Sequence, residues 1–392
     1  GVDKQTAKDY AKDLETNLKE LLERFKSGKY KAPPVRRTYI DKNDGKKKRP
    51  LGIPTFEDKL LQKAVQMILE AVYEQEFYDC SYGFRPGKSA HGALQAIWEG
   101  LTKLGGGWVI DADIKSYFEE IDHKHLRNFL DRRVRDGVIR RTIDKWLKAG
   151  VMEDKQVVHR TEGTPQGGVI SPLLANIYLH VVLDEWFETV VKPRLKGRAF
   201  LIRYADDFVI VVELEGDAKR IMNVLPKRFS KYGLTIHPEK TKMVDFSKPN
   251  RKGRSNQSGK GKVKAGTFDL LGFTHYWGKS RRGNWIVKRK TAKNRLSRTN
   301  RKINEYCKRN RHRPLKEQHQ KLSAMLIGHY LYFGLTGNAK SISKLRQETM
   351  RIWKKRLSRR SQKGYLTWEK FKKIMEKYPI PQVRMYQSIY RT

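Results

Sequence analysis

Hydrophobic positions along the chain change between helical and strand spacing, and this pattern predicts the first elements. Residues 6–29 carry apolar side chains three or four positions apart, which predicts an amphipathic helix. Residues 56–77 repeat this spacing and predict a second helix. Between them, a strand-like segment at residues 35–40 is followed by Asn43-Asp44-Gly45 and a second short strand, which predicts a basic hairpin.

Two more strand-like segments contain carboxylates. The segment 105–121 begins with glycines and contains Asp111 and Asp113, which lie two apart and therefore project from the same face of a strand. Residues 198–214 predict a hairpin in which Ala205-Asp206-Asp207 forms the tight turn. Asp is common in turns because it hydrogen-bonds its own backbone, so a purely structural turn is one interpretation. The other is that the two acid-bearing strands meet and hold two hard cations about 3.5 to 4 Å apart for phosphoryl transfer.

The last part of the chain is strongly basic. Residues 248–265 are rich in Gly, Ser and Lys and predict a mobile loop. A short hairpin is expected around Gly283-Asn284, with helices beyond it. Residues 281–313 contain fourteen Lys and Arg and one acid, Glu305, which favours a groove that follows phosphates over a merely solvated face. The aromatic group at residues 329–333 is interpreted as core rather than as a base-stacking surface.

The composition indicates a polyanionic partner. The 392 residues include 84 Lys and Arg against 42 Asp and Glu, and the resulting formal charge of +42 points to nucleic acid. The sequence contains no apolar run of about 18 residues, which argues against a membrane protein. Cys80 and Cys307 are the only cysteines, and their spacing supports neither a zinc site nor a disulfide scaffold, as is typical of a reducing intracellular compartment. The length allows two or three domains.

Three motifs, in order along the chain, resemble a known family. Asp113 with Phe118, TPQGGVISPLLANIYLH at 164–180 and YADD at 204–207 resemble the reverse transcriptases encoded by bacterial and organellar group II introns. The resemblance covers essentially the whole chain. The further matching segments are RPLGIPT at 49–55, YGFRPGKSAH at 82–91, GLTIHPEKTK at 233–242, LLGF at 270–273, and the C-terminal GHYLYFG, WKKRLSRRSQKGYLTWEKF and PIPQVRMY.

The resemblance implies a mixed α/β (α+β) right-hand polymerase fold. The fingers, with the N-terminal helix, would span residues 1–105. The palm, with an antiparallel sheet, the YADD hairpin and the loop 248–265, would span residues 106–280, and the helical thumb or maturase (X) domain residues 281–392. The implied activity is that of an RNA-directed DNA polymerase, a nucleotidyltransferase that uses two Mg²⁺ ions and dNTPs to extend a DNA primer on an RNA template. The family also implies binding of a structured group II intron RNA, assistance to its splicing and retrotransposition, and a bacterial cytoplasmic or nucleoid location.

The resemblance also implies a metal-binding set. Its members are Asp113, Ile114, Asp206 and Asp207. Asp113 and Asp206 match the two metal-binding aspartates of the family, whereas Asp111 is expected only to support the site. Lys240 is the candidate that protonates pyrophosphate, because a lysine with a lowered pKa acts as a general acid, and Lys242 stays an alternative.

Nucleotide and template contacts follow from the same resemblance. The implied nucleotide-binding set is Lys42, Arg49, Ile114, Phe118, Gln166 and Gly167. Phe118 stands where the family has an aromatic that collides with a ribose 2′-hydroxyl and so selects dNTPs, with ordinary core packing as the alternative. Gln166 and Gly167 are expected at the nascent base pair, and Ser171-Pro172 predicts the N-cap and first position of the helix that follows. The implied template- or RNA-binding set is Arg85, Lys288, Arg289, Lys290 and Arg295, with a structural ion pair as the alternative for Arg85.

Two rival functions share most of these residues. One is a non-catalytic RNA-binding splicing cofactor, against which the intact Asp113, Asp206 and Phe118 argue. The other is a domesticated polymerase in repair or phage defence, which the sequence does not separate from an intron protein. The chain ends at Thr392 without the Cys/His-containing endonuclease of many family members, so use of a ready-made primer is expected.

Overall fold

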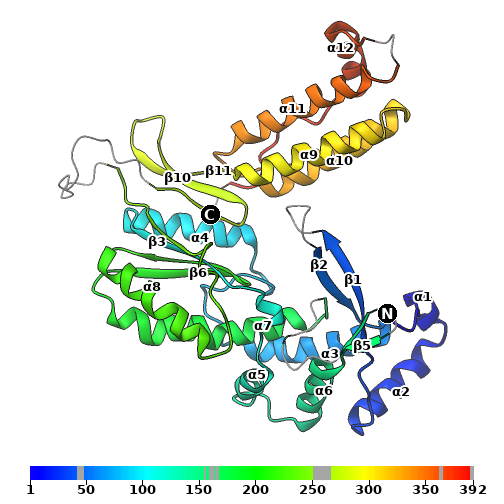
Figure 1. Cartoon of the computed structure of the whole chain (residues 1–392), viewed down its shortest axis with the longest axis vertical. Coiled ribbons are helices and arrows are strands. Elements are labelled where there is room, and N and C mark those ends of the chain that lie inside the picture. The colour runs from blue at the N-terminus through cyan, green and yellow to red at the C-terminus, as the bar shows by residue number, and fades with distance from the viewer. Residues whose placement is uncertain are drawn as a thin grey trace. The chain divides into compact units, whose positions relative to one another are not determined.

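The computed structural model describes residues 1–41, 48–153, 156–158, 163, 167–249, 266–361 and 365–388. They form two compact units, Gly1–Asp245 and Phe246–Thr392 (Figure 1). Both units combine helices with mainly antiparallel strands, so the mixed fold class expected from the sequence is confirmed. Among the described residues, no helix is long and apolar enough to span a membrane. The finer division into fingers, palm and thumb stays a prediction.

The first unit begins with short helices and a hairpin. The helix expected over residues 6–29 is divided into α1 (Ala7–Tyr10), η1 (Ala11–Asp13) and α2 (Leu14–Lys26). Asp13 breaks it because its backbone is not helical, with φ −135° and ψ 54°. The predicted hairpin is confirmed as β1 (Val35–Asp41) and β2 (Lys48–Ile53), and its turn at residues 42–47 lies outside the described residues.

The hairpin belongs to a four-stranded sheet with the order β2-β1-β4-β5. β1 pairs in parallel with β4 (Val151–Glu153), which pairs antiparallel with β5 (Gln156–Val158). Segments more than a hundred residues apart in the chain therefore share this sheet.

Helices follow, each started by a polar cap. They are α3 (Phe56–Tyr73), α4 (Ala90–Leu104), α5 (His123–Leu130) and α6 (Gly137–Lys148). The capping side chains, which accept hydrogen bonds from the first turns, are Thr55, Ser89, Asp122 and Asp136. α3 confirms the second helix expected from the sequence.

A four-stranded antiparallel sheet with the order β6-β7-β3-β8 forms the centre of the first unit. Its strands are β3 (Trp108–Asp113), β6 (Ala199–Tyr204), β7 (Asp207–Val212) and β8 (Lys242–Asp245). β7 lies between β3 and β6 and is buried, which explains its unbroken run of apolar residues after Asp207. α8 (Glu215–Ser230) packs against β3 and β7, and α4 packs against β6.

The segment after residue 170 is helical, as the sequence predicts. α7 (Ser171–Leu179) continues into the π-helical turns η3 (His180–Glu185) and η4 (Phe187–Val191), and the segment ends in η5 (Lys192–Arg194). The N-cap prediction is wrong by one residue, because Ile170 occupies the cap and Ser171 is already helical. The π turns change the angular position of each following side chain relative to an α-helix.

The second unit joins a three-stranded sheet to a helical layer. β9 (Phe268–Leu270), β10 (Phe273–Lys279) and β11 (Trp285–Thr291) have the order β11-β10-β9, which confirms the hairpin expected around Gly283-Asn284. The helices are α9 (Lys293–Arg309), α10 (Leu315–Phe333), α11 (Ala339–Leu357) and α12 (Trp368–Lys377).

The helices of the second unit enclose their own core. Leu322 and Leu326 of α10 are buried with Trp353 of α11, and Phe371 of α12 packs edge-on against that indole. Tyr330 is buried as well, and Phe333 stacks on His329, so the core interpretation of residues 329–333 is confirmed. The predicted mobile loop at 248–265 lies outside the described residues, except for positions 248 and 249.

Candidate active site

Asp113 and Asp206 meet at one end of the central sheet of the first unit. β3 ends at Asp113, which pairs across the strands with Asp207, the first residue of β7. Asp206 lies in the turn that joins β6 to β7. The prediction that the two acid-bearing strands meet is therefore confirmed.

The surroundings of these carboxylates favour a bound cation. Burial raises the pKa of Asp206 above its usual range, and the negative charge of Asp113 raises it further, while Arg49 and Arg203 oppose the rise. A buried carboxylate beside a second one is costly unless positive charge compensates it, so these oxygen donors fit a hard metal ion. Within the described ranges, no group of three or more His, Cys, Asp and Glu side chains is placed to hold one ion. A cation here would therefore take further ligands from backbone or phosphate oxygens.

The turn that carries Asp206 is tighter than the sequence predicted. Ala205 and Asp206 alone connect the strands, because Asp207 already belongs to β7. Ala205 has φ +57°, in the left-handed region that residues with a Cβ rarely adopt. Gly83 lies against this turn, and a Cβ at that position would approach the Ala205 nitrogen to 2.4 Å. The backbone near Gly83 thus supports the turn from outside the sheet.

Arg203 holds the turn from inside the protein. Its guanidinium is fully buried and donates to both carboxylate oxygens of Asp184, at 2.8 and 2.5 Å. The same group donates to the Asn176 side-chain oxygen at 2.9 Å and to the Ser81 hydroxyl at 2.7 Å. A further hydrogen bond of 3.1 Å reaches the carbonyl of Ala205, the residue before Asp206. A complete buried network of this kind fixes the backbone from which Asp206 projects.

The two candidate lysines are matched to different aspartates. The Lys240 ammonium forms an ion pair with Asp113 at 2.5 Å, and Lys242 forms one with Asp111 at 3.4 Å. The segment that carries them is anchored to β3, because the His237 amide donates to the Asp113 carbonyl at 2.8 Å. Lys240 therefore lies at the candidate site, and Lys242 lies beside the supporting acid Asp111.

Ile114 forms an isolated antiparallel bridge with Ile236. The hydrogen bonds of this bridge involve the Asp113 carbonyl and the Lys115 amide, the latter donating to Thr235 at 2.8 Å. The backbone groups of Ile114 itself consequently face away from residues 235–237. The Ile114 carbonyl is therefore oriented away from that segment and is a candidate oxygen ligand.

Phe118 is half-buried in the short helix η2 (Tyr117–Glu119). It packs against the core, and its ring centroid lies 5.4 Å from that of Tyr117. Tyr117 is anchored by a hydrogen bond of 2.5 Å from its hydroxyl to the Ala175 carbonyl. One part of the Phe118 ring thus packs on a fixed support while another part stays exposed, and the nucleotide-selecting role stays a prediction.

Arg49 approaches the acids from the first hairpin. It is exposed on β2 opposite Ile40, and its charge opposes the rise in the pKa of Asp206 that burial causes. This electrostatic influence is consistent with the predicted contact to an incoming triphosphate. Lys42 and Gln166, the other predicted nucleotide contacts of this region, lie outside the described residues.

Gly167 has a structural reason to be glycine. Its φ is +118°, and a Cβ there would approach the Gly52 carbonyl oxygen of β2 to 2.5 Å. The neighbouring Val169 amide donates to the Gln62 side-chain oxygen of α3 at 2.7 Å. Residues 167–170 are thereby held between β2 and α3, whereas the predicted contact of Gly167 with a base pair stays a prediction.

Arg85 is a structural residue in this fold. Its guanidinium is almost completely buried, forms an ion pair with Glu74 at 2.7 Å, and donates to the carbonyls of Tyr78 and Ser81. The structure thus shows the structural ion pair that was one of the two alternatives for Arg85, and the template contact stays a prediction.

Arg289 does not have the position expected of an RNA contact. Residues 285–291 form β11, the second strand of the hairpin expected around Gly283-Asn284, so side chains alternate between its two faces. Lys288 and Lys290 point outward, whereas Arg289 points inward and is 2% exposed. Arg289 therefore does not present its charge to an RNA surface, while Lys288, Lys290 and the half-buried Arg295 of α9 stay candidates.

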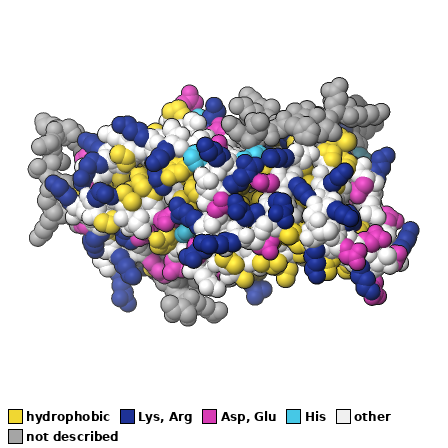
Figure 2. Space-filling model, turned by 90° about the horizontal axis from the view of Figure 1, so that it is seen from below, with side chains coloured by type: hydrophobic (Ala, Val, Ile, Leu, Met, Phe, Trp, Pro, Cys, Tyr) yellow, Lys and Arg dark blue, Asp and Glu magenta, His cyan; other side chains and the backbone are white. Residues whose placement is uncertain are grey.

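Basic side chains are not confined to these candidates. On the face shown in Figure 2, Lys and Arg are spread widely, with Asp and Glu between them. On this face, the positive charge is thus spread over the surface rather than gathered in a single patch.

Sequence reasoning missed Arg203 and its partners. The signal was present, because Arg203 is a charged residue within the apolar strand AFLIRY, as Asp206 and Asp207 are beside FVIVV. The partners Asp184 and Asn176 gave no such signal, since both lie in a helical segment where polar residues are ordinary.

Comparison with known families gives a match over most of the first unit. The model of a family described as reverse transcriptase (RNA-dependent DNA polymerase) matches residues 40–275. The match includes the residues of the candidate site, from Arg49 to Lys242.

Two of the three relatives described here carry names that refer to introns. The group II intron-encoded protein LtrA of Lactococcus lactis subsp. cremoris is 46% identical over 215 residues, 54% of this chain and 34% of that protein. Protein YkfC of Escherichia coli (strain K12) is 38% identical over 228 residues, 51% of this chain and 60% of that protein. The nuclear intron maturase 2, mitochondrial, of Arabidopsis thaliana is 26% identical over 231 residues, 49% of this chain and 30% of that protein. The matched regions thus span between about a third and three fifths of these relatives.

A solved structure shares the fold. The telomerase of Candida albicans, in a complex with a fragment of telomeric RNA, superposes with a TM-score of 0.51 at 14% identity, over 89% of this chain and 58% of that one. At this identity the likeness concerns the fold alone.

Proposed function

Because the chain belongs to the reverse transcriptase (RNA-dependent DNA polymerase) family, we propose that it synthesises DNA on an RNA template at Asp113 and Asp206. The observation that carries this proposal is the pairing of β3 with β7, which brings the two carboxylates to one end of a sheet. Arg49 and Lys240 supply positive charge beside them. A site of carboxylates and cations suits the transfer of a nucleotidyl group.

The proposed reaction joins a nucleotide to a primer. The primer 3′-hydroxyl oxygen loses its proton to solvent and forms a bond to the α-phosphorus of a dNTP, and the bond from that phosphorus to the pyrophosphate oxygen breaks. Two Mg²⁺ ions, when bound, supply activation of the hydroxyl and compensation of charge on the leaving oxygen. Asp113, Asp206 and the Ile114 carbonyl hold them in this proposal, with Asp207 beside them.

The remaining residues position the substrate and move a proton. Arg49 on β2 contacts the triphosphate, and Phe118 lies below the ribose, where a 2′-hydroxyl would clash with its ring. Lys240 gives a proton to the leaving pyrophosphate as a general acid. Its ion pair with Asp113 is the reason for preferring it to Lys242.

The partner RNA is proposed from the relatives. Since related proteins are named as intron-encoded proteins and maturases, we propose that this chain binds a structured group II intron RNA and assists its splicing and retrotransposition. Sequencing the RNA that copurifies with the protein tests this proposal. A structured intron containing the protein's own reading frame supports it, whereas an unrelated RNA would favour a domesticated polymerase.

Primer extension with Mg²⁺ on an RNA template tests the catalytic proposal. Asp113→Asn and Asp206→Asn should each fall below about 1% of wild-type activity, since loss of one group that stabilises transition-state charge costs about 10² to 10³ in kcat. Asp111→Asn is the matched control, because Asp111 lies on the same strand and face but pairs with Lys242. Substantial polymerisation by either site variant, or an equal loss in the control, would refute the assignment.

A further inference from the structure

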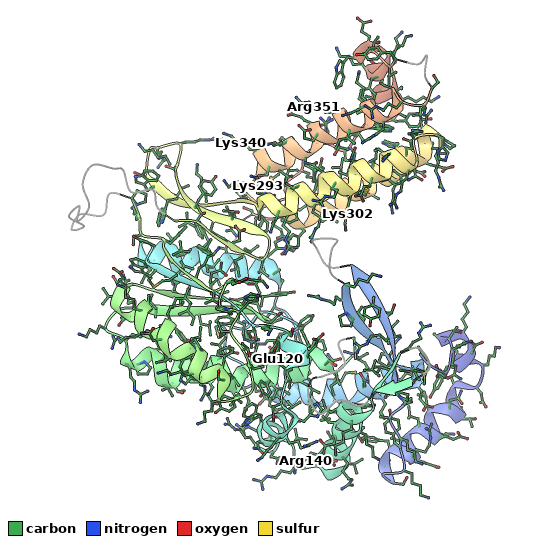
Figure 3. The ribbon with its side chains drawn as sticks, in the orientation of Figure 1. Glu120, Arg140, Lys293, Lys302, Lys340 and Arg351 are labelled. Carbon is green, nitrogen blue, oxygen red and sulfur yellow. The ribbon has the colours of Figure 1, made fainter. Side chains whose placement is uncertain are left out.

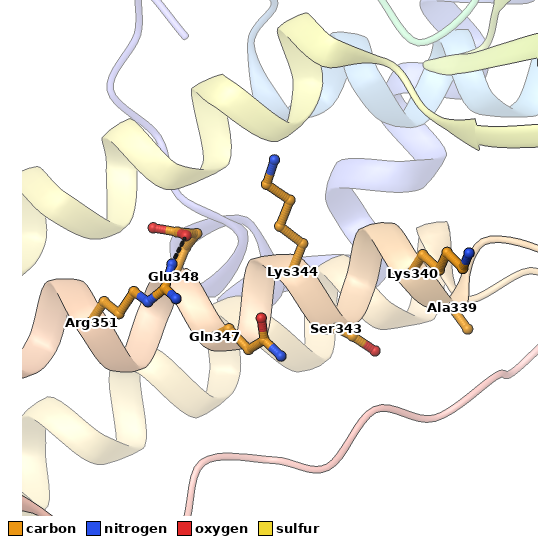
Figure 4. A pocket seen from close by; sticks show the side chains of 7 residues that line it. All are labelled: Ala339, Lys340, Ser343, Lys344, Gln347, Glu348 and Arg351. Atoms are coloured by element: carbon orange, nitrogen blue, oxygen red, sulfur yellow. Dashed lines mark hydrogen bonds and ion pairs between the residues drawn. The ribbon is translucent and has the colours of Figure 1, made fainter.

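The outward face of α11 is a basic stripe that the proposed active site does not use. Its exposed residues recur at intervals of three and four along the helix and are Lys340, Lys344, Gln347, Arg351 and Lys355. Figure 4 shows the part of this face that lines a hollow of about 460 Å³, where Arg351 pairs with Glu348 at 2.7 Å. From Lys340 to Lys355 the stripe covers about 22 Å, at about 1.5 Å per residue.

The stripe ends at two exposed aromatic rings. A second hollow, of about 370 Å³, is lined by Arg351, Lys355, Arg359, Tyr365 and Trp368, so Arg351 belongs to both hollows. Tyr365 is 75% exposed and Trp368 is 51% exposed. The exposed ring faces leave apolar surface in water that a stacked base would cover. Two such rings beside a basic stripe therefore offer a surface on which a base can stack.

The two rings are held in place before any ligand binds. The Lys354 ammonium lies 5.1 Å from the Tyr365 ring centroid and 4.9 Å from that of Trp368, at cation–π distance from both. Trp368 is the first residue of α12, whose start is fixed by the Thr367 cap, and it packs edge-on against the buried Phe371 at 5.8 Å. Fixed rings lose little conformational freedom when a base stacks on them.

Helix stability alone does not explain the charges. Lys354, Lys355 and Arg356 lie in the last turn of α11, where cations interact favourably with the helix dipole. Lys340 lies in the first turn, where a cation is unfavourable and where no acidic residue compensates it. Among the residues that line the two hollows, Glu348 is the single acid, and it is paired. The face is therefore suited to a polyanion along its whole length.

We propose that this α11 face binds an unpaired segment of RNA, whose phosphates follow the basic stripe and of which one base stacks on Tyr365 and Trp368. Basic side chains combined with stacking aromatics are the features that bind single strands, whereas a duplex offers no free base face. In Figure 3, Lys340 and Arg351 lie along α11, and Lys293 and Lys302 belong to α9, so the stripe is distinct from the predicted α9 and β11 contacts. The choice of RNA over DNA rests on the proposed function, but the stacking site itself does not.

The test measures binding of the full chain to a short oligoadenylate and to an abasic strand of the same length. Wild type should bind the oligoadenylate more tightly, and Tyr365→Ala combined with Trp368→Ala should weaken this binding about tenfold or more, as loss of base stacking does elsewhere. Trp368→Phe should restore most of the affinity, because it keeps a ring, and Tyr386→Ala in the same unit is the control. Trp368 fluorescence, taken as wild type minus Trp368→Phe, should be quenched by the oligoadenylate only.

The contribution of the basic stripe to binding is tested with two double variants that remove the same charge from different places. Lys340→Gln with Lys344→Gln should lower the slope of log Kd against log salt by about 1.4, at about 0.7 for each single-strand phosphate contact. Lys372→Gln with Lys373→Gln removes the same charge from exposed positions on α12 and should leave the slope unchanged. Equal affinity for the oligoadenylate and the abasic strand would overturn the proposal, and so would equal effects of the α11 and α12 double variants on the salt slope. Tighter binding of oligodeoxyadenylate than of oligoadenylate would overturn the assignment to RNA. Primer extension, measured in parallel, reports separately on the proposed polymerase site.

Discussion

Arg203 illustrates how a single buried residue can position Asp206, one of the two carboxylates proposed to act in catalysis. Its side chain is fully buried, forms two hydrogen bonds with Asp184, and binds the Ala205 carbonyl next to Asp206. A buried pair of this kind seldom adds much net stability, but breaking it leaves an unpaired charge that costs about 3 to 5 kcal/mol. Its geometric contribution is to hold a left-handed Ala205 in the turn.

We therefore expect Asp184→Asn to destabilise the protein and to displace the turn. The free energy of unfolding should fall by about 3 kcal/mol or more, and kcat for primer extension should fall at temperatures where the variant is fully folded. Arg198→Gln is the control, because Arg198 precedes the same strand and forms an exposed pair with Glu213, and exposed pairs contribute little to stability. Urea denaturation and primer extension measure the two effects. Wild-type kcat in a destabilised Asp184→Asn variant would show that the network is structural only.

Phe118→Ala should admit ribonucleotides. The exposed part of the ring is expected to exclude a 2′-hydroxyl by steric clash, and truncation removes the clash. The packed part of the ring predicts a stability loss as well, of up to about 3 kcal/mol for a half-buried aromatic. The measurement is the ratio of kcat/KM for dNTP and NTP in both proteins. A ratio that does not change would mean that Phe118 serves packing alone.

At the scale of single residues, the sequence revealed charges that interrupt apolar strands. Asp113 and Asp206 were found in this way, and Arg203 offered the same signal. Asp184 was not found, because it is separated from Arg203 by 19 positions and lies in a π-helical turn. Helical periodicity assumes 3.6 residues per turn, so it does not predict which way a side chain projects from a π turn.

At the scale of elements, the hydrophobic pattern predicted β1, β2, α3, β3, β6 and β7. β11 was expected only as one strand of the hairpin around Gly283-Asn284, and the directions of Lys288, Arg289 and Lys290 were not predicted because all three were counted only as charges. The structure restores the two-residue period, with Val287, Arg289 and Thr291 buried and Lys288 and Lys290 outward. Burial and the Arg289 charge lower the pKa of His275 to about 3, so Arg289 faces a neutral imidazole inside the unit.

The two faces of β11 should respond differently to the loss of charge. Lys288→Gln with Lys290→Gln should reduce the slope of log Kd for RNA against log salt by about 0.7 to 0.9 for each phosphate that is no longer neutralised. The free energy of unfolding should change little. Arg289→Gln should instead lower the free energy of unfolding by about 1 to 3 kcal/mol, since a buried group loses its partners, and should leave the salt slope unchanged. RNA binding titrated at several salt concentrations, together with urea denaturation, separates them. A slope change with Arg289→Gln alone would show that the sheet opens to bind RNA.

At the scale of the whole molecule, composition indicated the chemical class of the partner but not where the chain divides into units. The charge of +42 points to nucleic acid, but it does not show where the chain divides. The division at residues 245 and 246 follows from which segments pack together, since β8 pairs with β3 of the first unit whereas β9 pairs with β10 of the second. Such long-range pairing depends on tertiary contacts that local periodicity does not encode.

The distribution of charge predicts that catalysis and RNA affinity are separable. Asp206→Asn changes the formal charge from +42 to +43 and removes a proposed metal ligand at one sheet end, while basic side chains elsewhere are unchanged. RNA affinity that arises from many phosphate contacts should therefore change less than about twofold, because each contact contributes a small part of the salt-dependent binding energy. Under the proposed role in intron splicing, the variant should still promote splicing of the intron RNA, while it makes no cDNA. Splicing and primer extension assayed on one preparation measure both outcomes, and loss of both activities together would show that the carboxylate site also organises the RNA-binding surface.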